Sequence, residues 1–239
     1  MKLRSTAMTI VVAAILALVF ATPANAQPSP PLISSWLEQP AQLTPDTAYC
    51  ADTYDSETLG NCAAGLTNQF RNSIGAPNPG YSYVTGIGGT IIPFCGYAFF
   101  ITLYCDENVR FGQMTLDDVL KQRIVHPQLY AAFLGAHESA HHSQTVVGGK
   151  HLTDTFYTSE GKPDELQADC FGGAAIRYLM QQGIFSYEDA QAMTAMLERA
   201  PPLWTHGSGQ ERNNAFWIGF NAPSVAVCIG GAFIGTPLF

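Results

Sequence analysis

The chain has 239 residues, of which 47% are hydrophobic, and a net charge of −8. This length and composition suit one packed domain with a short N-terminal extension. The excess of acidic side chains makes nucleic acid and anionic membrane surfaces poor partners, so we expect neither to be bound.

The first 26 residues have the pattern of a signal peptide. Lys2 and Arg4 precede an uncharged apolar run over residues 8–20, and Ala24-Asn25-Ala26 follows as a small-x-small cleavage site. The apolar run is shorter than the ~20 residues that span a bilayer. We therefore expect cleavage after Ala26, no stable membrane anchor afterwards, and a secreted or cell-envelope (periplasmic) location.

All six cysteines lie beyond residue 26. An even number of cysteines in an exported chain predicts disulfides and no free thiol. The sequence alone does not fix their connectivity. Our hypothesis is two local loops and one long-range crosslink, namely Cys50–Cys62, Cys95–Cys105 and Cys170–Cys228.

Residues 27–85 read as an N-terminal linker or extension, and residues 86–239 as the main domain. Residues 27–45 are rich in Pro, Ser and Gln, which is typical of a flexible linker. Weak helical character is confined to residues 66–70. The prolines and glycines of residues 75–89 predict a loop.

Two strands are expected next, over residues 90–94 and 97–104, because both segments are rich in β-branched and aromatic residues. Pro93 would suit an edge strand, since it cannot donate a ladder hydrogen bond. An edge strand at residues 90–94 would hold an extended substrate by strand addition, which is a hypothesis from composition alone.

The second half of the chain predicts helices, each bounded by capping residues, prolines or glycines. They are a helix opened by Thr115, one over 128–147 after Pro127 and before Gly148-Gly149, one over 164–182 between Pro163 and Gly183, one from Ser186 to about residue 201, and one from Ser208 through Phe220. The apolar residues 225–239 are expected to form a buried tail, with a partner-binding surface as the alternative.

Residues 136–142 contain a His-Glu-x-x-His motif within the helix expected over 128–147. His137 and His141 fall one turn apart on the same helix face, where two neutral imidazoles can reach one zinc ion. Glu138 lies beside that face and could take a proton from a zinc-bound water. The motif also arises by chance on polar helices, so a third ligand is needed.

Glu165 supplies that ligand in our prediction. It lies 24 residues after His141, and Asp169 follows it one helical turn later on the same face. Asp169 could accept a hydrogen bond from the second nitrogen of a ligand imidazole. Arg212 could orient Asp169 or another carboxylate, and an ordinary surface arginine is the alternative. Two histidines and one glutamate leave a fourth position for water, which is typical of catalytic zinc. An ordinary solvated acidic pair is the alternative.

Other candidates fit the zinc site less well. The metzincin spacing would need His at position 147, where this chain has Val147. His151 and Asp164 are the next ligands to test if Glu165 is not one. His142 is expected to pack near the site rather than bind the metal, and His126 is expected to be a loop residue.

His206, just before the last predicted helix, is a candidate catalytic residue. A hydrogen-bond-donating histidine near the zinc could stabilise the oxyanion that forms when water attacks a carbonyl. A helix-entry histidine without a catalytic role is the alternative. Tyr157 is a weaker candidate for the same role.

Several blocks of sequence together resemble a family of bacterial neutral zinc metallopeptidases. The resemblance covers roughly residues 86–228 and rests on residues 136–144, 165–173, 206–208 with Arg212 and 216–220, and 104–105 with 110–112. Departures are mild, such as Ser139-Ala140 where a glycine usually precedes the second histidine.

The resemblance implies a gluzincin-type site. His137, His141 and Glu165 would be the zinc ligands, Glu138 the base and His206 a catalytic residue. It also implies a zincin-like α+β fold that is mostly helical, with a small β-sheet and disulfides. The expected function is hydrolysis of peptide or protein substrates with one Zn²⁺ per chain. A secreted zinc-binding protein without activity, or a disulfide-linked interaction protein with an incidental motif, are the alternatives.

Overall fold

The fold is seen in a computed structural model that describes residues 41–51, 55–85, 101–105, 107–122, 125–149, 161–199 and 205–233. These residues belong to one compact unit, Trp36–Phe239. No helix among them combines the length and the apolar character that crossing a membrane requires. The predicted signal peptide and the predicted strand at residues 90–94 lie outside the described residues.

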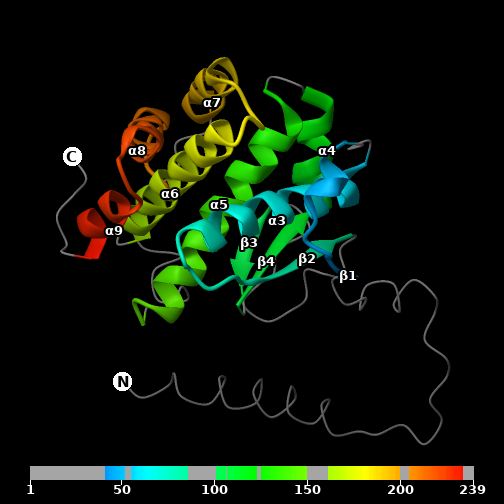
Figure 1. The fold of residues 1–239 in the computed structure, drawn as a ribbon, viewed down its shortest axis with the longest axis horizontal. Helices are drawn as coiled ribbons and strands as arrows, with labels where there is room; N and C mark the ends of the chain where they lie inside the picture. The colour runs from blue at the N-terminus through cyan, green and yellow to red at the C-terminus, as the bar shows by residue number, and fades with distance from the viewer. Residues whose placement is uncertain are drawn as a thin grey trace, which may run out of the picture. The chain divides into compact units, whose positions relative to one another are not determined.

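The described part of the chain is mostly helical and carries one small sheet, which confirms that part of the predicted fold class (Figure 1). The strands are β1 (Ala41–Gln42), β2 (Gly80–Val84), β3 (Leu103–Cys105) and β4 (Asn108–Gly112). The helices are η2 (Thr47–Ala51), α3 (Ser56–Ser73), α4 (Gln113–Gln122), α5 (Pro127–Val146), α6 (Lys162–Gln181), α7 (Tyr187–Arg199), α8 (Gly209–Asn221) and α9 (Ala226–Phe233).

The sheet has the strand order β1-β2-β4-β3. β2 runs parallel to β4, with Tyr81 opposite Val109, and the two outer pairs are antiparallel. The loop predicted over residues 75–89 is therefore wrong at β2. The dense prolines and glycines around it obscured a short run, Tyr81 to Val84, that is buried along its length. The predicted strand over 97–104 is described only at its end, within β3.

Helix α3 corrects the prediction of a linker or extension over residues 27–85. Asp55 caps it by accepting a hydrogen bond from the backbone of Thr58 at 2.7 Å, and its apolar side is buried against α5. The small residues in its middle, Ala63 to Gly65, hid the helical period from the sequence. β2 and α3 lie in the same unit, Trp36–Phe239, as the motif helix, and α3 packs against that helix.

The predicted helices of the second half are confirmed. Pro127 occupies the first turn of α5, and Gly149 follows α5 with a φ of 65°. Gly183 takes the same left-handed conformation after α6, with a φ of 74°. Ser208 and Glu211 form the predicted capping box of α8. Helix α4 begins two residues before the predicted Thr115.

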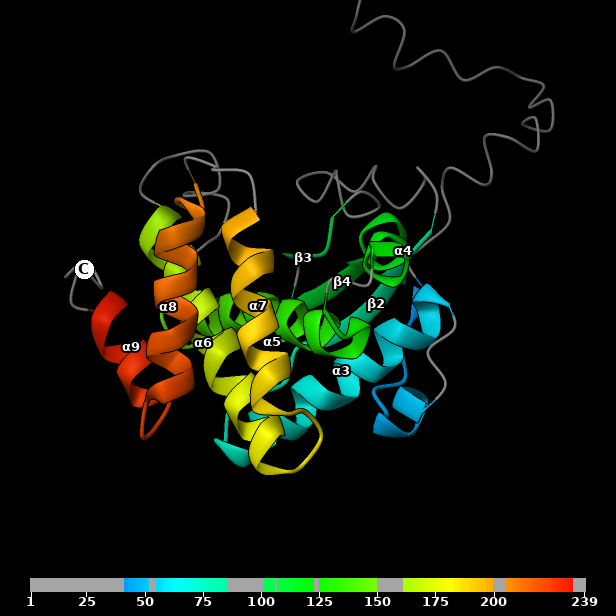
Figure 2. The ribbon, with the colours of Figure 1, turned by 90° about the horizontal axis from the view of Figure 1, so that it is seen from above.

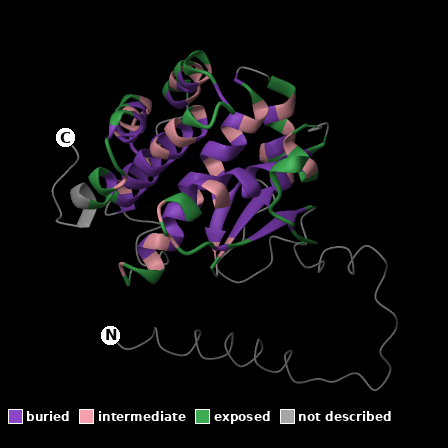
Figure 3. Cartoon of the chain, viewed as in Figure 1, coloured by how far each residue is buried: buried purple, intermediate pink, exposed green. Residues whose placement is uncertain are grey.

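Helix α5 separates two packed regions (Figures 1 and 2). On one side it meets α3, α4 and the sheet, where Phe111 and Leu116 are fully buried. On the other side it meets α6, and α8 packs against the far side of α6. Phe133 of α5, Ile176 of α6 and Phe216 of α8 share this second core. Figure 3 shows that the inner strands and the facing sides of the helices are buried.

Helices α6 and α8 approach each other so closely that their backbones are in contact. A Cβ atom on Gly173 would overlap the carbonyl oxygen of Phe216, and one on Gly219 would overlap that of Cys170. Glycine is therefore required at both positions. This close contact fixes the first turns of α8 beside the N-terminal half of α6, where the predicted site residues lie.

Two of the predicted disulfides are confirmed, Cys50–Cys62 and Cys170–Cys228. Cys105 is disulfide-bonded as well, and no cysteine is free among the described residues. Cys95, its predicted partner, lies outside them. The predicted buried tail is only partly correct, since Cys228 is buried but Val227 and Ile229 of α9 are 40% and 41% exposed.

Candidate metal centre

The motif helix α5 presents His137 and His141 to the interior. Both residues are buried, at 3% and 4% exposure, and their ring centroids lie 5.1 Å apart. Their spacing of one helical turn places them on one face, as the sequence predicts. This face of α5 is turned toward the N-terminal half of α6.

Glu165 of α6 is the centre of the site. Its Oε2 atom lies 3.1 Å from Nε2 of His137, 3.5 Å from Nε2 of His141 and 3.1 Å from Nε2 of His206. The structure thus brings together the three predicted metal ligands and the predicted catalytic histidine. Among the described residues, His137, Glu165 and His206 form a group whose ligand atoms could hold a metal ion.

The second nitrogen of His137 faces a buried carboxylate. Nδ1 of His137 lies 2.9 Å from Oδ1 of Asp169, which is completely buried. Arg212 of α8 donates to both oxygens of Asp169, at 2.8 and 2.9 Å. Burial raises the pKa of Asp169, but the charges and hydrogen bonds of Arg212 and His137 together outweigh that effect, and the net pKa is lowered. Asp169 and Arg212 therefore occupy the positions that the sequence analysis gave them.

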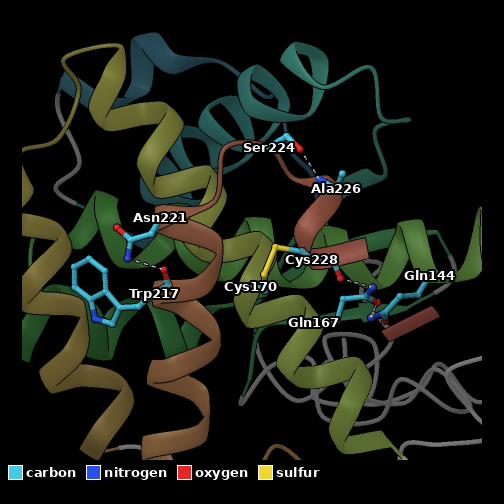
Figure 4. Close-up of a disulfide and its surroundings, with 8 residues drawn as sticks. All are labelled: Gln144, Gln167, Cys170, Trp217, Asn221, Ser224, Ala226 and Cys228. Carbon is cyan, nitrogen blue, oxygen red and sulfur yellow. Dashed lines mark hydrogen bonds between the residues drawn. A yellow bond between two sulfur atoms is a disulfide. The ribbon is translucent and has the colours of Figure 1, made fainter. Parts of the chain in front are cut away.

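The second nitrogen of His141 faces an amide, which the sequence analysis missed. Nδ1 of His141 lies 2.7 Å from Oε1 of Gln144. Nε2 of Gln144 donates to Oε1 of Gln167 at 2.7 Å, and Nε2 of Gln167 donates to the carbonyl of Cys228 at 3.0 Å (Figure 4). The available signal was the spacing of three residues between His141 and Gln144 on one helix.

Glu138 is held beside the cluster by the edge of the sheet. The backbone N–H of Tyr104 in β3 donates to its Oε2 at 2.8 Å. Burial raises the pKa of Glu138, although the charges of His137 and His141 oppose that effect. Among the described residues, neither Glu138 nor His141 belongs to the close group formed by His137, Glu165 and His206, and Nε2 of His141 lies 3.5 Å from Glu165. The Tyr104 N–H thus positions the carboxylate of Glu138.

His206 lies in the turn that precedes α8. Gly207 has a φ of 85°, a left-handed conformation that glycine adopts without strain, and Ser208 then caps the helix. Thr205 Oγ1 lies 2.7 Å from Nδ1 of His206. The side chain is 26% exposed, so it forms the open side of the cluster. Burial lowers the pKa of His206 to about 4, which keeps it neutral at pH 7.

Charge in the cluster favours a bound cation. Burial alone would lower the pKa of His137, but its hydrogen bonds to Asp169 and Glu165 raise it to about 10. Burial would likewise raise the pKa of Glu165, but the charge of His141 and a hydrogen bond to His137 hold it well below its usual range. Two buried carboxylates thus hold positive charge on the imidazoles in the absence of metal.

His142 and His126, the two other histidines among the described residues, have contacts away from the cluster centre. Nδ1 of His142 lies 3.1 Å from the hydroxyl of Tyr104, in agreement with a packing role. His126 precedes α5 and contacts the ring of Phe185. His151 and Tyr157 lie outside the described residues.

Imidazole nitrogens and a carboxylate oxygen are a donor set that zinc prefers, although other divalent transition metals bind it too. Each imidazole has its second nitrogen within hydrogen-bonding distance of a fixed partner, as is usual for metal-binding histidines. The residues therefore fit a metal centre. Comparison with models of known protein families, with curated proteins and with solved structures finds no match to this chain.

Proposed function

We propose that the protein is an exported zinc-dependent peptidase. The observation that carries the proposal is the convergence of three imidazole Nε2 atoms on one oxygen of Glu165, with the carboxylate of Glu138 fixed beside them. The disulfides Cys50–Cys62 and Cys170–Cys228 favour an oxidising compartment.

In this proposal His137, His141 and Glu165 hold the zinc, one ion per chain. Zinc held there would polarise a peptide carbonyl and lower the pKa of a water molecule. Asp169 keeps the proton of His137 on Nδ1, so that Nε2 presents its lone pair to the centre. Gln144 does the same for His141.

Glu138 is the base. Its carboxylate takes a proton from the attacking water and passes it to the leaving amine. The N–H of Tyr104 fixes one carboxylate oxygen. Burial raises the pKa of Glu138, which makes the carboxylate a stronger base. Positioned in this way, the side chain needs no ligand role.

His206 stabilises the developing oxyanion. It is neutral at pH 7, so one of its ring nitrogens carries a proton that it can donate. Its place on the open side of the cluster is where a substrate carbonyl would enter. Thr205 Oγ1 at Nδ1 fixes the ring.

A zinc-binding protein without activity is the second candidate, and one observation favours it. Nε2 of His206 is as close to the Glu165 oxygen as Nε2 of His137, and Nε2 of His141 is farther. If His206 bound zinc together with the other three side chains, no position would remain for water. His206→Ala separates the candidates: the peptidase keeps its zinc and loses turnover, whereas the closed site loses zinc affinity.

The proposal is tested with the purified chain lacking residues 1–26. We expect about one zinc per chain by elemental analysis, cleavage of a peptide library, and loss of cleavage after chelation that zinc restores. Zinc binding without cleavage of any library member would favour the second candidate. Absence of bound metal would contradict both.

A further inference from the structure

We propose that Gln144, Gln167 and the carbonyl of Cys228, here called the amide relay, position His141 for metal binding. We propose further that the relay makes metal affinity depend on the Cys170–Cys228 disulfide. The inference rests on the metal centre of the proposed function, but not on peptidase activity. It extends the orienting role of Gln144 to the buried Gln167 and to the Cys170–Cys228 disulfide.

The direction of every hydrogen bond in the relay is fixed from its far end. A backbone carbonyl can only accept, so the Cys228 carbonyl requires Gln167 to present its NH₂ group. Gln167 therefore turns its oxygen toward Gln144 and accepts from it at 2.7 Å. Figure 4 shows these side chains in line from α9 to α5.

Two acceptors fix the orientation of the Gln144 amide group. Its NH₂ group donates to Gln167 and, at 2.9 Å, to the carbonyl of Asp164, which can also only accept. Its oxygen is then left for Nδ1 of His141, which must carry a proton to donate. A neutral His141 consequently keeps its lone pair on Nε2, the atom that faces Glu165.

The interior location of the relay makes this orientation strict. Gln144 and Gln167 are 3% and 2% exposed. A reversed amide would bring like groups together, with no solvent to compensate for the lost hydrogen bonds. The relay thus sets the tautomer and the ring orientation of His141 without a charged group.

The disulfide fixes the far end of the relay. Cys228 is completely buried against α6 and shares a core cluster with Ala136 and Ala140 of the motif helix. Its neighbours Val227 and Ile229 are 40% and 41% exposed. The bond to Cys170 and the hydrogen bond from Gln167 therefore act together with the packing of α9 on α6 to hold this carbonyl in place.

The test is a double-mutant cycle on zinc affinity, measured by competition with a chromophoric chelator. Gln144→Met keeps the side-chain volume but removes the acceptor for His141, and we expect affinity to fall about 10–100-fold. Gln167→Met and the double variant Cys170→Ala/Cys228→Ala should each weaken zinc binding by about 3–10-fold, since they act at greater distance. Thermal unfolding of each metal-free variant shows that it is folded.

Two matched controls separate the relay from general loosening. Gln181→Met changes an exposed glutamine at the end of the same helix, α6, and Cys50→Ala/Cys62→Ala removes a disulfide remote from the relay. Both should leave zinc affinity unchanged. In the Gln167→Met background, loss of the Cys170–Cys228 bond should have no further effect on affinity, because the link is already broken.

Unchanged zinc affinity in Gln144→Met would overturn the proposal. If Gln144→Met does not fold, Gln167→Met and the cysteine variants decide in its place. Additive losses in the cycle would also contradict the relay, because the disulfide would then act independently of Gln167. These outcomes are distinct from failure of the proposed function, in which the wild type binds zinc with the predicted cycle but cleaves no peptide. A wild type that binds no zinc contradicts both proposals.

Discussion

The two imidazoles of the motif helix are supported in opposite ways. Nδ1 of His137 contacts Asp169 of α6, which is paired with Arg212 of α8; we call this pair the charged support. Nδ1 of His141 contacts Gln144, the first residue of the uncharged amide relay that ends at α9; we call this relay the neutral support. A single metal centre would thus depend on the contacts of α6 with both α8 and α9.

The two supports should differ in how much folding stability is lost when one of their residues is removed. Charge-assisted hydrogen bonds are stronger than neutral ones, but removing one partner of a buried pair leaves an uncompensated charge. Loss of Asp169 would leave the guanidinium charge of Arg212 without its carboxylate partner, in a side chain that is only 15% exposed. Loss of Gln144 leaves no charge behind. The charged support should therefore couple metal affinity to folding stability more strongly than the neutral one.

The largest effect is expected where both supports converge. Glu165→Ala removes the oxygen that all three Nε2 atoms face, so zinc binding should be lost or severely weakened. Zinc stoichiometry after gel filtration measures this, with Glu188→Ala on the exposed face of α7 as the control. Wild-type affinity in Glu165→Ala would show that another residue is the third ligand, with Asp164 or His151 next to be tested.

The second effect breaks the charged support alone. Asp169→Ala should weaken zinc binding about 10–100-fold and destabilise the metal-free protein by about 3–5 kcal/mol. Chelator competition and denaturant unfolding measure the two quantities separately. Gln144→Met is the matched variant on the neutral side and should show the loss of affinity with a smaller loss of stability. Equal destabilisation by both variants would contradict the distinction.

The smallest effect concerns the turn that carries His206, outside both supports. A hydrogen bond from Lys162 and the backbone N–H of Ser208 lower the pKa of Glu211 to about 2. Because this pKa is depressed, its stabilisation is present above the unfolded pKa of ~4.5 and is lost as pH falls toward 2. Glu211→Gln should lower stability slightly at pH 7. In thermal unfolding at different pH values, the stability difference between the variant and the wild type should shrink through that acidic range. A stability difference that does not change with pH would contradict the proposed contribution of Glu211.

The sequence predicted the site better than the sheet. His137, Glu138 and His141 follow from helical spacing, and Asp169 from the same rule applied to α6, because period and distance are simply related along a helix. These features are local in sequence. Arg212 is different, because the sequence left a surface role open for it and its contact with Asp169 joins α8 to α6.

What the sequence did not reveal depends on contacts between distant segments. The parallel pairing of β2 with β4 joins Tyr81 to Val109 over the intervening residues 85–107, so a short strand among prolines gave no local signal. Gln144 and Gln167 are ordinary helix residues until Cys228 is placed beside them. Tyr104 likewise reaches Glu138 through backbone geometry, which no side-chain pattern encodes.

The most direct test of the central claim is Glu138→Gln. The variant keeps the shape of the side chain but cannot accept a proton, so kcat on a library-derived peptide should fall about 10²–10⁴-fold. Zinc content should remain near one per chain, because the variant leaves His137, His141 and Glu165 unchanged. Glu188→Gln, the same change on an exposed face of α7, should have no effect. Full activity in Glu138→Gln would contradict the account, since hydrolysis would then proceed without the proposed base.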